Sequence, residues 1–218
     1  NPRQVGFQET PVAESFKHFT KFSTKVNKSE LFENTLKLAI NKCFEGRPGP
    51  SLVDLPLDIQ NSTLDSFTFD NFIEQKPKPY LISEIDVILD KLKESKRPLL
   101  LLGQGIKLGK ANKEAKKLIE KLQIPFVVSW GGFDTIPHDH PLFVGDIGVY
   151  GSRGGNYAIQ NCDLLLSIGS RLDTRQTGGQ LDSFSRDSYK IMVDIDANEI
   201  YKDRGIKIDL PIVKDAQE

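Results

Sequence analysis

The sequence contains few of the residues that mark special chemical environments. Its 218 residues include two cysteines, one methionine, one tryptophan and three histidines. Cys43 and Cys162 lie far apart, in patterns typical of helical and apolar segments, so neither a paired-cysteine zinc motif nor a disulfide framework is present. We therefore expect two core thiols and a reducing, cytoplasmic environment.

Long apolar runs and an excess of charge of one sign are also missing. No segment approaches the roughly 18 apolar residues of a membrane span, and Asn1–Gln4 does not begin a signal peptide. The 29 basic and 30 acidic side chains leave a formal net charge of -1, and 38% of the residues are hydrophobic. We therefore expect a folded chain with no membrane and no nucleic-acid partner. The missing initiator methionine indicates a truncated chain, one domain and a piece of another.

The first part of the chain predicts one helix and one strand. Apolar residues at helical spacing predict a helix over residues 30–45, with Ser29 as its N-cap. The segment Gly46–Pro50 cannot continue a helix, and Ser51–Leu55 is typical of a short buried strand. Because one helix and one strand form no core alone, we interpret residues 1–60 as a piece of an α/β domain. The polar residues 61–80 are the predicted linker.

From residue 81 to residue 218, apolar strands alternate with amphipathic helices. The pattern predicts helices near residues 82–92, 110–122 and 156–161, and strands at residues 98–102, 125–129, 164–168 and 191–195. Continuously apolar strands separated by such helices are typical of a parallel sheet covered on both faces. We therefore expect a doubly wound α/β fold.

Residues suited to binding phosphate follow three of these predicted strands. They are Gly103 and Gly105, then Ser129 and Trp130, then Gly169 with Arg171, Asp173 and Arg175. Ligands of open parallel sheets bind beyond the carboxyl ends of the strands. Glycine allows a phosphate to approach the backbone, and arginine can pair with it through two N–H groups. These segments together predict a nucleotide site.

Two familiar nucleotide motifs are absent. Leu108 stands where a dinucleotide-binding motif has its third glycine, and no Gly-Lys-Ser/Thr occurs. In an extended segment, Arg171, Asp173 and Arg175 would share one side. They would then form either a clamp on a diphosphate or ribose, or a self-paired run of surface charges.

The remaining chemistry-bearing residues predict no catalytic centre. His138 and His140 lie between two prolines, and we expect an extended surface loop with the imidazoles on opposite sides and no metal. Trp130 would either stack on a planar ligand or pack against the core. Because no acid–base or nucleophile motif occurs, we expect a binding domain rather than a complete catalyst.

A series of motifs runs in order along nearly the whole chain. They are Phe7–Thr10, Gly46–Pro56, Gly103-x-Gly105, Ile124–Pro125, Asp139–Leu142, Asn156–Ala158, Asp163–Leu165, Gly169–Gly178 and Asp194–Asp196. The series resembles thiamine diphosphate-dependent enzymes of the acetolactate synthase (acetohydroxyacid synthase large subunit) type.

The resemblance implies a three-domain enzyme. Residues 1–60 would be the C-terminal part of the pyrimidine-binding domain, residues 61–80 a linker and residues 81–218 the central FAD- or nucleotide-binding domain. The full parent, a homodimer or homotetramer with thiamine diphosphate and Mg²⁺, would decarboxylate pyruvate or another 2-oxo acid and join the product to a carbonyl acceptor. Since the family's catalytic glutamate and magnesium-binding segment do not occur here, we expect this fragment alone to be inactive.

The resemblance also implies residues that contact a structural FAD. They are Arg47, Gly103, Gly105, Ser129, Trp130, Gly148, Gly151, Gly169, Arg171, Asp173, Arg175, Asp194, Ile195 and Asp215. Phe7 and Gln8 would lie near the active-site entrance.

Some positions depart from the family pattern. Leu57 stands where biosynthetic members have a lysine at the substrate channel, and Tyr150 where they have a flavin-contacting histidine. Gln104 interrupts a triple glycine, and Lys214 replaces a glycine. Two alternatives therefore stay open. One is a flavin-free 2-oxo acid decarboxylase relative, and the other is a non-catalytic nucleotide-binding or assembly module.

Overall fold

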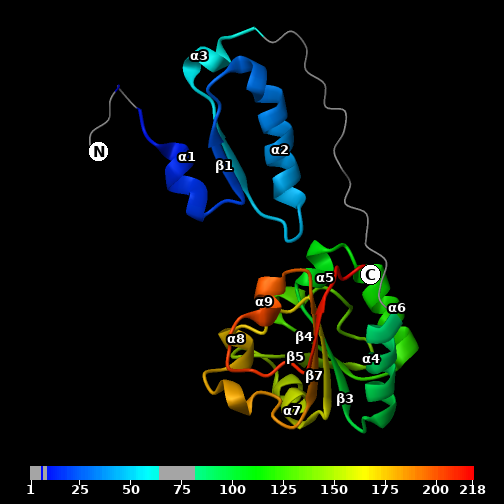
Figure 1. The fold of residues 1–218 in the computed structure, drawn as a ribbon. Coiled ribbons are helices and arrows are strands. Elements are labelled where there is room, and N and C mark those ends of the chain that lie inside the picture. The colour runs from blue at the N-terminus through cyan, green and yellow to red at the C-terminus, as the bar shows by residue number, and fades with distance from the viewer. Residues whose placement is uncertain (1–5, 7–8, 64–81) are drawn as a thin grey trace. The chain divides into compact units, whose positions relative to one another are not determined.

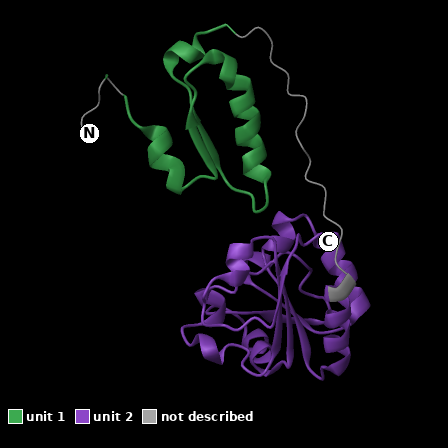
Figure 2. Cartoon of the chain, viewed as in Figure 1, with its two compact units in different colours: residues 1–76 green, residues 77–218 purple. Residues whose placement is uncertain are grey.

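The chain divides into two compact units, residues 1–76 and residues 77–218 (Figure 2). The structure, a computed structural model, describes residue 6 and residues 9–63 and 82–218. Phe7, Gln8 and most of the predicted linker lie outside the described residues. The assignment of the parts to a pyrimidine-binding domain, a linker and a central domain stays a prediction.

The first unit is a small α/β arrangement. Its elements are α1 (Val12–Ser15), β1 (Phe22–Lys25), α2 (Phe32–Phe44), β2 (Ser51–Asp54) and α3 (Leu57–Gln60), with 3₁₀ turns η1 (Phe16–His18) and η2 (Ser29–Leu31). β1 and β2 pair in parallel, with Phe22 opposite Ser51. The prediction that Ser29 caps the helix is wrong. Ser29 begins a 3₁₀ turn, and α2 starts after Leu31 without a side-chain cap.

The second unit alternates strands and helices. Its elements are α4 (Ile82–Glu94), β3 (Pro98–Leu102), α5 (Gly105–Leu108), α6 (Asn112–Leu122), β4 (Phe126–Val128), η3 (Trp130–Gly132), β5 (Phe143–Asp146), α7 (Arg153–Asn161), β6 (Leu164–Ile168), α8 (Thr174–Thr177), η4 (Leu181–Ser183), β7 (Tyr189–Asp194), α9 (Ala197–Tyr201) and β8 (Leu210–Val213). The strands form one sheet in the order β5-β4-β3-β6-β7-β8, and every neighbouring pair is parallel (Figure 1).

The alternation of side chains along the strands divides the core into two halves. Leu100 and Leu102 of β3 pack with α4 and α6 on one face of the sheet. Leu99 and Leu101 point to the other face, where α7 and α9 pack. Successive side chains of a strand point to opposite faces, so a strand buried on both faces must be apolar throughout. The predicted doubly wound α/β fold is confirmed.

The two edge strands, β5 and β8, were not predicted. β5 has the sequence Phe-Val-Gly-Asp, and β8 contains Pro211. Edge strands are covered less completely than central ones and tolerate proline, so their sequences carry a weaker strand signal. The helix predicted from residue 156 in fact begins at Arg153, where the Ser152 hydroxyl accepts a hydrogen bond from the backbone N–H of Gly155 at 3.1 Å.

The loops after β3 and β6 touch each other backbone to backbone. The N–H of Gly105 donates to the carbonyl oxygen of Gly169 at 2.8 Å, and the N–H of Gly103 donates to that of Ile168 at 2.9 Å. A Cβ atom on Gly103 would lie 2.1 Å from the Gly169 oxygen. Gly169 itself has φ of +63°, which disfavours other residues. β3 and β6 flank the switch point of the doubly wound sheet, where ligands bind in this class of fold.

At the amino-terminal ends of the strands, Asp163 anchors the turn between α4 and β3. Its carboxylate accepts hydrogen bonds from the N–H groups of Lys96 and Arg97, both at 2.9 Å, and from the Ser95 hydroxyl. Burial alone would raise the pKa of Asp163, but these hydrogen bonds outweigh it and hold the pKa below its ordinary value.

Within residues 9–63 and 82–218, no helix is long and apolar enough to cross a membrane.

Replacing Gly103 with alanine tests the backbone contact between the two loops. Because the added methyl group would overlap the Gly169 carbonyl, we expect Gly103→Ala to destabilise the second unit by about 1 to 3 kcal/mol. Urea denaturation followed by Trp130 fluorescence measures this, since the sole tryptophan lies in that unit. Gly179→Ala is the matched control, because nothing lies within 4 Å of a Cβ there. Equal stability of both variants would contradict the close contact.

Replacing Asp163 with asparagine tests the anchor through its pH dependence. A carboxylate whose pKa is lower in the folded state stabilises that state above its unfolded pKa of about 3.9, and this contribution is lost as pH falls through the folded pKa. We expect Asp163→Asn to cost about 1 to 3 kcal/mol at pH 7, and the difference from the parent to shrink below about pH 4. Asp90→Asn, on the exposed side of α4, should cost much less. A difference that stays constant from pH 7 to pH 3 would refute this role.

Candidate functional site

The loops at the carboxyl ends of β3, β4 and β6 lie together. The N–H of Ser129 donates to the carbonyl oxygen of Leu102 at 2.9 Å, directly before Gly103. A Cβ atom on Gly103 would lie 2.5 Å from the Cα atom of Ser170, the neighbour of Arg171. The structure therefore brings Gly103, Ser129 and Arg171 to one edge of the sheet. Their part in ligand binding stays a prediction.

The loop after β5 joins the same edge. The N–H of Val149 donates to the carbonyl oxygen of Arg175 at 2.9 Å, and Gly148 packs against that carbonyl with φ of +105°. The Asn156 side chain holds this loop through both the N–H and the carbonyl oxygen of Gly148, each at 2.9 Å. Gly151 closes the turn, because its N–H donates to the Gly148 carbonyl oxygen at 2.9 Å.

An exposed aromatic pair connects the loops after β4 and β5. The ring centroids of Trp130 and Tyr150 lie 5.6 Å apart in an edge-on arrangement. Trp130 is 63% exposed and Tyr150 is 75% exposed, and Val149 beside them is 68% exposed. Of the two interpretations of Trp130, core packing is wrong. A large exposed aromatic surface at this edge is suited to a planar ligand or a partner surface.

The glycines allow close packing between the loops. The N–H groups of Gly103 and Gly105 donate to the loop after β6, and that of Gly169 donates to the carbonyl oxygen of Val193 at 2.9 Å. N–H groups already bonded to backbone carbonyls are not available to a phosphate. These three N–H groups are therefore taken, and the expectation that the glycines let a phosphate approach the backbone stays a prediction.

The segment from Arg171 to Arg175 is not extended as predicted. Leu172 has φ of +48°, and the Asp173 carboxylate accepts a hydrogen bond from the backbone N–H of Arg175 at 2.9 Å, which caps α8. Asp173 thus binds backbone rather than a neighbouring arginine side chain. Within the described residues, the guanidinium group of Arg175 has no hydrogen bond or ion pair, and the side chain is exposed.

Arg171 is held by a residue that sequence analysis missed. Its Nε atom donates to Oε1 of Glu199 at 2.8 Å, and Glu199 is only 8% exposed. The second carboxylate oxygen of Glu199 binds Lys202. Burial raises the pKa of Glu199, but Lys202 and Arg171 outweigh burial and lower it overall, so the group stays ionised. The sequence gives little signal for this pair, because 28 positions separate its members.

Arg204 is a second residue that sequence analysis missed. Its Nη1 atom donates to the backbone carbonyl oxygen of Arg171. Its Nε and Nη2 atoms are buried and have no hydrogen-bond acceptor among the described residues. Burial lowers the pKa of Arg204, although Glu199 and Asp194 oppose this effect. Two buried donors without an acceptor, beside Arg171, are suited to an anionic group.

Asp194, Ile195 and Asp215 lie farther along the same end of the sheet. Asp194 ends β7, and its Oδ1 atom accepts a hydrogen bond from the N–H of Asp196 at 2.9 Å. A Cβ atom on Gly109 would lie 3.2 Å from Oδ1 of Asp215, so Asp215 lies beside the end of α5. Asp215 also lines a cavity of about 640 Å³ at the carboxyl ends of β3 and β6, on the α4 and α6 side.

Arg47 belongs to the first unit. Its backbone carbonyl oxygen accepts a hydrogen bond from the Lys21 side chain at 2.8 Å. The proposed contact of Arg47 with a cofactor stays a prediction.

The segment from His138 to His140 forms a turn rather than an extended loop. The N–H of His140 donates to the Pro137 carbonyl oxygen at 3.3 Å. The His138 ring stacks on Phe143 at 4.8 Å, and the His140 ring packs edge-on against Phe126 at 5.4 Å. Both imidazoles therefore take part in aromatic packing. No group of three His, Cys, Asp or Glu residues suited to a metal ion occurs in the part of the chain that the structure describes.

Comparisons with known proteins match this chain to enzymes that use thiamine pyrophosphate. Residues 85–218 match the family model "Thiamine pyrophosphate enzyme, central domain". The probable acetolactate synthase large subunit of Methanocaldococcus jannaschii is 33% identical over 97% of the chain and 36% of its own length. The acetolactate synthase large subunit of Corynebacterium glutamicum is 35% identical over 97% of the chain and 34% of its own length.

A plant relative matches nearly as much of the chain. The probable chloroplastic acetolactate synthase 2 of Oryza sativa is 34% identical over 93% of the chain and 31% of its own length. The chain thus spans about a third of the length of these relatives. Because the family model covers more than half of the chain and the matched unit has the expected parallel sheet, the chain belongs to the thiamine pyrophosphate enzymes.

Proposed function

We propose that the whole protein is an acetolactate synthase-like enzyme. It would decarboxylate pyruvate or another 2-oxo acid and join the product to a second carbonyl compound, using thiamine diphosphate and Mg²⁺. Three relatives carrying the name acetolactate synthase, each matched over more than nine-tenths of this chain, support the proposal. Thiamine diphosphate would supply the electron sink for decarboxylation. We also propose a cytoplasmic homodimer or homotetramer that needs no nucleic-acid or membrane partner.

The second unit would contribute a cofactor site rather than the reacting groups. We propose that it binds FAD or another adenine nucleotide at the carboxyl edge of its sheet. The observation that carries this proposal is the convergence of the loops after β3, β4, β5 and β6 at the switch point. In a doubly wound sheet this is the ordinary position for a nucleotide.

The side chains at this edge fit an aromatic, anionic cofactor. Trp130 and Tyr150 would stack against a flavin or adenine ring, since both are largely exposed. The Arg175 guanidinium, which has no partner among the described residues, would pair with a diphosphate. Arg204 would donate from its two buried N–H groups. In this role FAD would be structural and would take no part in the main reaction.

Arg171 would act by position rather than as the main anion contact. Its Nε atom is committed to Glu199, and its carbonyl oxygen accepts from Arg204. The guanidinium keeps its Nη groups on a side chain that is half exposed. Glu199 therefore holds Arg171 at the edge, and the two free Nη groups could bind an oxygen of the ligand.

A flavin-free 2-oxo acid decarboxylase is a second candidate. Tyr150 stands where the family has a flavin-contacting histidine, and its exposed ring provides stacking surface in place of a titratable imidazole. Leu57, 71% exposed in the first unit, cannot supply the charge of the family's lysine. Both departures favour a changed substrate or cofactor rather than loss of the fold.

An assay of the protein from its complete reading frame tests the proposed reaction. With thiamine diphosphate, Mg²⁺ and pyruvate, we expect release of carbon dioxide together with a carboligation product. Aldehyde as the sole product would favour the decarboxylase. No consumption of pyruvate or of other 2-oxo acids would contradict both and favour the non-catalytic module. An absorbance band near 450 nm in the purified protein would show whether flavin is bound.

Removing the charge of Arg175 tests the nucleotide site directly. We expect Arg175→Gln to weaken binding of FAD or ADP to the full chain by about 1 to 3 kcal/mol, because one charged hydrogen-bonding group is lost. Isothermal titration calorimetry measures the affinity. Lys116→Gln is the control, since it removes the same charge from an exposed position of α6. Unchanged affinity in Arg175→Gln would show that this arginine is only a surface charge.

A further inference from the structure

A buried lysine lies at the amino-terminal edge of the sheet, away from the proposed nucleotide site. Lys190 is the second residue of β7, and only 7% of its surface is exposed. Lysine is almost never buried to this extent without a charged or strongly bonded partner. The proposed enzyme function gives no reason for a lysine to be buried at this position.

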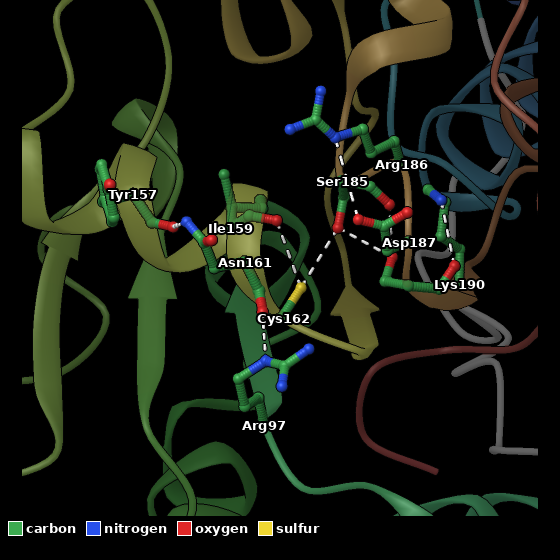
Figure 3. Close-up of polar contacts among 10 residues, drawn as sticks. Arg97, Tyr157, Ile159, Asn161, Cys162, Ser185, Arg186, Asp187 and Lys190 are labelled. Atoms are coloured by element: carbon green, nitrogen blue, oxygen red, sulfur yellow. Dashed lines mark hydrogen bonds and ion pairs between the residues drawn. The ribbon is translucent and has the colours of Figure 1, made fainter.

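The ammonium group of Lys190 has one acceptor within the described residues. Its Nζ atom donates to the backbone carbonyl oxygen of Ser188 at 3.1 Å (Figure 3). An ammonium has three N–H groups to donate. Two donors therefore have no acceptor in this part of the structure, although only 7% of the residue is exposed.

The hydroxyl and thiol groups of Ser185, Ser188 and Cys162 bond to one another and to backbone carbonyl oxygens, and none of them bonds to the Lys190 ammonium in the described residues. The Ser188 hydroxyl donates to the Ser185 carbonyl oxygen at 2.8 Å, and the two serine hydroxyls lie 2.8 Å apart. The Cys162 Sγ atom lies 3.2 Å from the Ser185 hydroxyl and donates to the Ile159 carbonyl oxygen at 3.3 Å (Figure 3). Burial raises the pKa of the Cys162 thiol, so it supplies no negative charge at neutral pH.

The carboxylate of Asp209, which accepts the backbone N–H of Lys190, is committed to other donors. Its Oδ1 atom pairs with Nζ of Lys207 at 2.8 Å, and its Oδ2 atom accepts from the backbone N–H of Lys190 at 2.9 Å. Burial lowers the pKa of Lys190, and the carboxylates of Asp209 and Asp187 only partly oppose this effect, while Lys207 adds to it. The positive charge is thus incompletely balanced by the protein.

A cavity of about 340 Å³ opens beside Lys190 and is lined by further cations. Arg186 and Lys207 line it together with Lys190 and the polar residue Ser188. The acidic lining residues are Asp209, which is paired with Lys207, and Asp182. The volume exceeds the roughly 30 Å³ that one water occupies in the liquid by about tenfold. A small molecule with an anionic group would therefore fit.

We propose that this cavity binds a small oxyanion, a phosphate or carboxylate group, through the two spare N–H donors of Lys190. Arg186 would add charge at the mouth of the cavity. An oxyanion accepts several charge-assisted hydrogen bonds and so supplies what the buried ammonium lacks. The site is separate from the nucleotide site, because the two lie at opposite ends of the parallel strands.

Thermal unfolding in phosphate tests the proposal on the full chain. Trp130 fluorescence reports the second unit alone, since Trp130 is the sole tryptophan. At a phosphate concentration tenfold above Kd, and with ionic strength held constant by chloride, we expect the Tm to rise by about 3 to 6 °C. Acetate in a parallel series shows whether a carboxylate binds as well.

Lys190→Met is the decisive variant. It replaces the unbalanced charge with an apolar chain of similar length, so we expect it to fold with an equal or higher Tm in chloride and to lose the response to phosphate. Arg186→Gln should weaken the phosphate response several-fold. Lys116→Gln is the matched control, because it removes an exposed cation of α6 that does not line this cavity, and it should leave the response intact.

Three outcomes would overturn the proposal. The first is no rise of the parent's Tm in phosphate beyond that in chloride. The second is a phosphate response that Lys190→Met keeps, which would indicate weak binding to surface charges. The third is a response lost in Arg175→Gln but kept in Lys190→Met, which would place the phosphate at the nucleotide site.

Discussion

The contact between the backbones of the β3 and β6 loops is the constraint on which the rest of this edge depends. Because Gly103 and Gly105 have no Cβ atom, their chain can lie against Gly169 and exchange hydrogen bonds with its loop. This contact fixes the two loops that flank the switch point of the sheet. The loops after β4 and β5 then attach to them through Ser129 and Val149. The glycines therefore allow the loops to pack together, and the polar and aromatic side chains of the neighbouring residues line this end of the sheet.

Some side chains at this end of the sheet are held by hydrogen bonds, and others are exposed. Glu199 and Arg204 hold Arg171 by its side chain and its carbonyl oxygen. Arg175, Trp130 and Tyr150 present charge and aromatic surface outward. The fixed frame would lose little conformational entropy when a ligand binds, whereas the exposed side chains would be ordered by the ligand at some entropic cost. At the amino-terminal ends of the strands, the buried Lys190 also has N–H donors without an acceptor among the described residues, and it lines a cavity.

The central fold follows from sequence because strands buried on both faces, such as β3, must be apolar throughout. The edge strands escaped prediction, since β5 and β8 are not buried in that way and β8 includes Pro211. The segment from Arg171 to Arg175 was predicted to be extended, and this is wrong because the Asp173 carboxylate bonds to the backbone and caps a helix. The pairing of Arg171 with Glu199, and the unpaired donors of Arg204 and Lys190, depend on tertiary contacts that one sequence does not display.

The most direct test of the account uses the tryptophan at the centre of the proposed nucleotide site. Trp130 fluorescence can be followed while FAD or ADP is added to the full chain, with correction for absorbed light. The account predicts saturable quenching by FAD and a change in Trp130 emission with ADP, because the exposed ring becomes covered. Emission that stays unchanged at ligand concentrations where calorimetry shows saturation would put the ligand elsewhere. Absence of binding by both methods would contradict a nucleotide site at this edge.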